Sequence, residues 1–152
     1  MHYIVYTCYT TGVARPASFR LPEDLVERIG HEASSRHTSV TALVTTLLDE
    51  GLKTRQFPGV VYRDGPAGRR AGVVGGPDVW EIIRAVERAP GKGERRLRHV
   101  ADELGLPAHQ LRLAVDFYAA FPGDVDERIA ADERAAQRLR TAVERRERLL
   151  SR

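Results

Sequence analysis

The chain has 152 residues, 42% hydrophobic and 30% charged, which suits one ordinary domain or two very small ones with a buried core. No apolar run approaches the ~18 residues of a membrane span, and the N-terminus lacks the basic start and long apolar centre of a secretory signal. The single cysteine, Cys8, excludes an internal disulfide framework and a multi-cysteine zinc site. These features predict a soluble cytoplasmic protein without a metal or cofactor.

The basic residues are unusual in kind, because 22 of the 24 are arginines and only Lys53 and Lys92 are lysines. Arginine suits phosphate and guanine, although genome base composition produces the same bias. Basic and acidic residues nearly balance along the chain. Residues 14–56 contain six basic and six acidic side chains, residues 57–123 contain ten basic and eight acidic, and residues 124–152 contain eight basic and seven acidic. A nucleic-acid surface must therefore arise from the placement of charges on one face.

Two breaks, at 56–59 and 121–124, combine proline and glycine with the ends of helical patterns. They divide the chain into an N-terminal extension (1–13), a first module (14–56), a second module (57–124) and a tail (125–152). The predicted fold is mainly α-helical.

The first module begins with a strand pattern, since Ala17, Phe19 and Leu21 alternate with Ser18 and Arg20. Pro22 then begins a helix with acidic residues in its first turn. After a turn in which His37 tolerates a left-handed backbone, Ser39 is the predicted N-cap of a second helix. The apolar residues of that helix recur at helical spacing: Val40, Leu43, Val44, Leu47, Leu48 and Leu52.

A single strand has no partner and two open edges, so the module is expected to form an intertwined homodimer whose strands pair about a twofold axis. A two-stranded ribbon of that kind fits the DNA major groove. The segments 19–25 (FRLPEDL) and 38–44 (TSVTALV) resemble the ribbon-helix-helix family of the MetJ/Arc class. The predicted dimer core contains Phe19, Leu21, Leu43 and Leu47.

The resemblance implies that outward strand side chains contact base edges, which points to Arg20 and Ser18. Pro16 occupies the third outward position and offers no side-chain hydrogen bond, so Arg15 is the third candidate. The resemblance also implies a phosphate at the start of the second helix, on Thr38, Ser39 and Val40. The alternative is that this module serves only for dimerisation.

The second module begins with two β-prone runs, 60–62 and 71–74, which predict a hairpin carrying Arg69 and Arg70 at its tip or shoulder. Asp78 caps the next predicted helix. The segment 97–114 matches a helix-turn-helix, with Gly105 in the turn. Its predicted core residues are Val100, Leu104, Leu106, Leu111 and Ala114, and Trp80 and Phe117 are also expected in a core or interface.

If the second helix of this motif lies in a groove, its candidate base contacts are Gln110 and Arg112. Candidate phosphate contacts are Arg95, Arg96 and Arg98, and the hairpin with Arg69 and Arg70 would then resemble a wing. The alternative is a packing unit that binds no nucleic acid.

The segment 60–129 is similar to a winged-helix-like family found in type II antitoxins. The similarity lies in 75–80 (GGPDVW), 100–104 (VADEL), 117–122 (FYAAFP) and 126–129 (DERI). It implies an antitoxin that represses its own operon and binds a small PIN-like nuclease toxin.

The tail contains no proline or glycine after Val125 and is predicted to be one long helix. Its narrow apolar stripe is weak for a self-sufficient coiled coil. It can fold back on its own module, pair with a second copy or lie in a groove of a partner. The antitoxin resemblance favours the partner, with Ile129, Leu139, Val143 and Leu150 as its binding residues.

No cysteine or histidine pair, or paired acid site, supports catalysis, so the chain is not expected to be an enzyme. The leading hypothesis is a DNA-binding transcriptional regulator that forms a homodimer, with a tetramer on double-stranded DNA as a further option. The resemblance implies that this regulator is an antitoxin. The alternatives are a transcription factor without a toxin and a protein-interaction adaptor.

Overall fold

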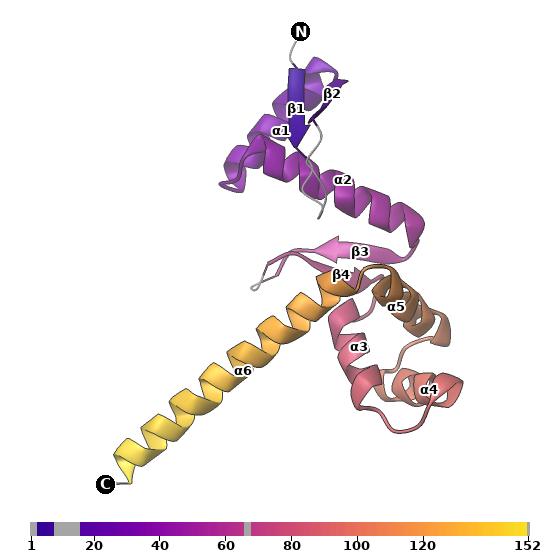
Figure 1. The fold of residues 1–152 in the computed structure, drawn as a ribbon, viewed down its shortest axis with the longest axis vertical. Helices are drawn as coiled ribbons and strands as arrows, with labels where there is room; N and C mark the ends of the chain where they lie inside the picture. Colours follow the sequence, from indigo (N-terminus) through magenta and orange to yellow (C-terminus); the bar gives the residue numbers. More distant parts are fainter. Residues whose placement is uncertain (1–2, 8–15, 66–67, 152) are drawn as a thin grey trace. The chain divides into compact units, whose positions relative to one another are not determined.

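The computed structural model describes residues 3–7, 16–65 and 68–151 and is mainly helical (Figure 1). The chain divides into two compact units, Met1–Gln56 (unit 1) and Phe57–Arg152 (unit 2). No helix of the described residues is both long and apolar enough to cross a membrane.

Unit 1 consists of two strands and two helices: β1 (Tyr3–Thr7), β2 (Pro16–Arg20), α1 (Glu23–Ser35) and α2 (Val40–Gln56). The predicted strand and both helices of this module are confirmed. The expectation that the strand lacks a partner in its own chain is wrong, because β1 and β2 pair antiparallel with Ile4 opposite Phe19. The sequence of β1, Tyr-Ile-Val-Tyr-Thr, consists of aromatic and β-branched residues, which favour an extended backbone, but no strand was predicted there.

The connection between α1 and α2 is fixed by local hydrogen bonds. His37 has a φ of 51°, the left-handed conformation expected for this turn. The backbone N–H of Thr38 donates to the carbonyl of Ala33 (3.0 Å), which closes the end of α1. The Ser39 hydroxyl accepts the backbone N–H of Ala42 (3.1 Å), which confirms Ser39 as the N-cap of α2.

The core of unit 1 is small. Of the six apolar positions predicted on α2, only Leu43 and Val44 are buried. On α1, Ala33 is also buried. Leu47, Leu48 and Leu52 retain 48%, 51% and 68% exposure. A single copy of unit 1 therefore leaves much of its apolar surface uncovered.

Unit 2 begins with an antiparallel hairpin, β3 (Val60–Arg63) and β4 (Arg70–Val73), as predicted. Four helices follow: α3 (Val79–Arg88), α4 (Gly93–Leu104), α5 (Ala108–Ala120) and α6 (Pro122–Leu150). Gly105 joins α4 to α5 with a φ of 63°, a conformation that glycine adopts without a steric penalty. The two predicted helices of this segment, α4 and α5, are thus present with a short turn between them.

The hairpin and all four helices contribute to the core of unit 2. Trp80 and Phe117 are buried there, as predicted, and so are Val100, Leu111 and Ala114. Leu106 is partly buried against this core, whereas Leu104, which was expected to point inward, is 40% exposed. Leu104 is the last residue of α4, where the helix turns away from the core. The first turn of α6 belongs to the core through Val125, and the C-terminal half extends away from the other helices of unit 2 (Figure 1).

Asp78 joins the hairpin to α3. Its carboxylate accepts hydrogen bonds from Arg63 Nη2 (2.9 Å) and Trp80 Nε1 (3.3 Å) and forms an ion pair with Arg70. Its backbone N–H donates to Glu81 Oε2 (2.9 Å), in the capping box that begins α3. Because Asp78 is 6% exposed, its charge depends on these partners for stabilisation.

Replacing Asp78 by alanine is expected to lower the free energy of unfolding of unit 2 by about 2–3 kcal/mol. Disrupting a fully buried ion pair would lower the free energy of unfolding further. Here the Arg63 and Arg70 side chains retain 39% and 21% exposure, so water screens part of the interaction. Urea denaturation measures the loss, with Glu144→Gln as the control because the pair of Glu144 with Arg148 is exposed. Equal stability of the two variants would contradict the role assigned to Asp78.

Candidate nucleic-acid interface

The first part of the candidate interface is the outward face of β2. Ser18 and Arg20 are exposed and two positions apart, so they lie on the same face of the strand. The register sets Ser18 opposite Val5 and Arg20 opposite Tyr3. Arg20 forms no ion pair with any residue that the structure describes, so its guanidinium is available to a ligand. Arg15, the third predicted base contact, lies outside the described residues.

The second part is the start of α2, where phosphate contacts were predicted on Thr38, Ser39 and Val40. Thr38 and Ser39 are exposed and Val40 is half-buried. The first intrahelical hydrogen bond runs from Leu43 N–H to the Ser39 carbonyl, so the N–H groups before it have no helical acceptor. Such a helix start, with a serine cap, has the donors and the dipole direction that favour an anion.

The predicted dimer-core residues differ in burial. Leu43 is buried, Leu21 is half-buried, and Phe19 and Leu47 are about half exposed. A hollow of about 650 Å³ between α1 and α2 is lined on its apolar side by Leu25, Ile29, Leu43 and Leu47. This apolar surface is exposed to solvent in a single chain. A second protein surface could therefore bury it on association.

The predicted base contacts of the helix–turn–helix are held by groups of unit 2 itself. Gln110 Nε2 donates to the carbonyl of Val74 (3.0 Å), and Arg112 Nη2 donates to Glu94 Oε2 (2.7 Å). The bond to Arg112 holds the pKa of Glu94 below its ordinary value, and the same bond raises the pKa of Arg112. These bonds occupy part of the hydrogen-bonding capacity of each side chain and direct it toward groups of unit 2.

The remaining arginines of this candidate site are divided. Arg96 Nε donates to the carbonyl of Gly91 (2.9 Å), whereas Arg95 and Arg98 are exposed. On the hairpin, Arg69 pairs with Asp64 (3.2 Å) and Arg70 with Asp78. The structure therefore does not bring the predicted second-site residues together as one set of available donors.

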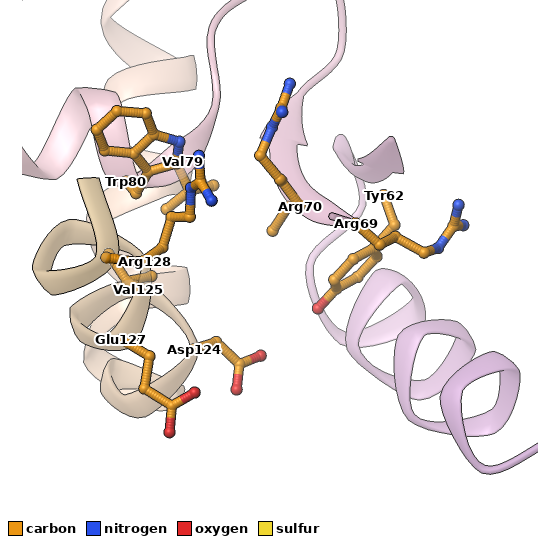
Figure 2. A pocket seen from close by; sticks show the side chains of 11 residues that line it. Tyr62, Arg69, Arg70, Val79, Trp80, Asp124, Val125, Glu127 and Arg128 are labelled. Carbon is orange, nitrogen blue, oxygen red and sulfur yellow. The ribbon is translucent and has the colours of Figure 1, made fainter. Parts of the chain in front are cut away.

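A hollow of about 350 Å³ lies between the hairpin and the start of α6 (Figure 2). Tyr62, Arg69 and Arg70 come from the hairpin side, and Trp80 and Arg128 from the helical side. The Arg128 guanidinium lies 5.4 Å from the centre of the Trp80 ring, a cation–π contact. Since the hairpin arginines are paired, we interpret this hollow as a junction between the hairpin and the helices.

The predicted partner-binding residues of the tail lie along α6. Ile129 packs against the core of unit 2, whereas Leu139, Val143 and Leu150 are exposed. Tyr118 Oη donates to Asp126 Oδ1 (3.1 Å), which ties α5 to the beginning of α6 and raises the pKa of Tyr118. Only the beginning of the tail therefore packs on its own module.

The sequence analysis did not single out Arg84, Arg88, Arg134 and Arg140, which line one groove of unit 2. The spacing of Arg84 and Arg88 indicates one side of a helix. Nothing in the sequence indicated which part of α6 would lie opposite α3.

Comparison with known protein families, curated proteins and solved structures gives no match for this chain. Among the described residues, no group of three or more histidine, cysteine, aspartate or glutamate side chains could hold a metal ion. The functional argument therefore depends on the surfaces of the two units.

Proposed function

We propose that this chain is a sequence-specific DNA-binding regulator that acts as a homodimer and uses β2 of unit 1 to contact DNA. The observation that carries the proposal is the exposed pair Ser18 and Arg20 on one face of β2, directly before Pro22 and the α1–α2 hairpin. Arg20 can donate two hydrogen bonds to O6 and N7 of guanine, and Ser18 adds a short donor and acceptor. The start of α2 contacts a backbone phosphate and sets the position of the ribbon.

The homodimer is supported by the apolar surface that a single unit 1 leaves open. Phe19 of β2 and Leu47 of α2 retain 50% and 48% exposure. In the described residues β2 pairs only with β1, so its other edge is open to a second strand. In the proposed dimer the two copies of β2 pair about the twofold axis along that edge, and Phe19 and Leu47 become buried.

The proposal includes a protein partner for α6, a small PIN-like nuclease toxin, which would make the chain a type II antitoxin that represses its own operon. It is supported by four apolar side chains of α6 that project away from the core of unit 2: Leu139, Val143, Leu149 and Leu150. A helix with such a stripe suits an apolar groove on another protein. In this arrangement the chain regulates and inhibits, and it has no catalytic role.

Arg20→Ala is expected to weaken binding to the operator by about 1–3 kcal/mol, because a bidentate guanine contact is lost, while the dimer stays intact. Fluorescence anisotropy with the DNA upstream of the gene measures the change. Arg55→Ala, which removes the same charge from the exposed end of α2, is the matched control and should bind nearly as well as wild type. Unchanged binding by the Arg20 variant would mean that β2 does not contact the bases.

Leu47→Asp is expected to abolish the dimer, because dimerisation would bury an unpaired carboxylate. Sedimentation velocity gives the oligomeric state. Thr46→Asp places the same charge on the preceding residue of α2, which is exposed and lies off the apolar stripe, and should leave the dimer intact. A dimeric Leu47 variant would refute the proposed interface.

Leu139→Gln combined with Val143→Gln is expected to lower affinity for the partner at least about tenfold, since two buried apolar contacts are lost. Co-purification with the protein encoded by the adjacent reading frame tests this. Glu144→Gln with Arg148→Gln is the control, because it removes an exposed ion pair on the other side of the same helix and leaves the net charge unchanged. Failure of the wild-type protein to retain that product would remove the toxin from the proposal and leave the DNA-binding function standing.

A further inference from the structure

A groove between α3 and α6 in unit 2 is lined by several arginines. It has a volume of about 650 Å³. The helices α3 and α6 are in contact and diverge from the start of α6 (Figure 1). The ionisable lining of the groove consists of four arginines and two carboxylates: Arg84, Arg88, Arg134, Arg140, Asp132 and Glu133. Positive charge therefore exceeds negative charge in a groove that is open to solvent.

The arginines of the groove differ in how they are held. Arg84 pairs with Asp132 across the two helices, which fixes α6 against α3. Arg140 donates to the neutral amide oxygen of Gln137 (2.9 and 3.2 Å) and pairs with no carboxylate in the part of the chain that the structure describes. Arg88 and Arg134 have no carboxylate partner among the residues that the structure describes. Three guanidinium groups in one groove thus keep their charge available to an anion.

We propose that this groove binds the phosphate backbone of double-stranded DNA, independently of base sequence. The inference adds a second DNA contact to the proposed function and rests on that function for duplex DNA as the polyanion. The proposed second contact lies in the α3–α6 groove. It takes the place of the contact first predicted on α5, where Gln110 bonds to Val74 and Arg112 to Glu94.

The lining favours phosphate over an acidic protein segment. Its apolar residues are only Ala130 and Ala136, so the groove offers no pocket for the large anchor side chains on which protein–protein affinity depends. A guanidinium, in contrast, matches the oxygens of a phosphate with two parallel donors and needs no apolar anchor. Arginines spaced along a groove can follow successive phosphates of one strand.

The test is the binding of a fluorescein-labelled duplex of random sequence by full-length protein at several salt concentrations. Arg88→Gln with Arg134→Gln keeps the aliphatic stems and removes both charges. The expected result is a loss of about three- to tenfold in affinity at low salt, and a slope of log K against log salt that is shallower by about two. Thermal unfolding verifies that the variant remains folded.

The matched control is Arg138→Gln with Arg145→Gln, which removes the same charge from exposed positions of α6 outside the groove. It should leave the salt slope nearly unchanged. Equal losses in the two double variants would show a general effect of net charge and would overturn the proposal. An unchanged affinity and slope for the groove variant would also overturn it.

Glu133→Gln gives a result of opposite sign, because it removes a carboxylate from the groove and should tighten binding of the same duplex. Weaker or equal binding would contradict the proposal. A groove variant that loses polyglutamate binding and keeps DNA binding would assign the groove to an acidic protein.

Because the probe has no operator sequence, these results are separate from the Arg20 test. The Arg20 test can fail while the groove variant still loses affinity for the random duplex. Conversely, the groove test can fail while Arg20→Ala still weakens binding to the operator.

Discussion

The buried carboxylate of Asp78 is the interaction on which the arrangement of unit 2 depends most. One side chain receives Arg63 and Arg70 from the hairpin and the Trp80 indole from α3, at the residue where α3 begins. Because Asp78 is 6% exposed, loss of either arginine would leave its carboxylate buried with less compensation for its charge. The orientation of Trp80 in turn provides the surface over which Arg84 and Arg128 lie.

The same ion pairs divide the arginines of the chain by role. Those on the hairpin and at the start of α5 are held by Asp64, Asp78 and Glu94, so they contribute to structure. Arg20 on β2, and Arg88 and Arg134 in the α3–α6 groove, have no such carboxylate among the described residues. A chain whose basic and acidic residues nearly balance can in this way present local positive charge. We place the proposed DNA contacts at these three arginines.

Local patterns in the sequence were sufficient for the helices and the hairpin of unit 2. Ser39 and Asp78 could be assigned as caps because capping depends on residues within one turn. The intrachain partner of β2 was missed because β1, at Tyr3–Thr7, lies in a segment for which no strand was predicted. Strand pairing depends on contacts that alternation in one strand does not reveal.

The candidate site was less predictable, because it depends on long-range pairing of charges. Exposure on a helix made Arg112 a reasonable base contact, but its partner Glu94 lies 18 positions away on another helix. The groove arginines were missed for the same reason, since Arg84 and Asp132 are 48 positions apart. Leu104 illustrates the limit of periodicity at a helix end, where the last residue points away from the core.

The central claim is that this chain recognises a specific DNA sequence through unit 1. The most direct measurement is the binding of the purified wild-type protein to the DNA upstream of its own gene, by anisotropy at several salt concentrations with scrambled duplex as competitor. The account predicts tight binding that survives scrambled competitor and weakens as salt rises. Equal affinity for the upstream and scrambled duplexes would contradict it, because the bases would then make no difference to binding.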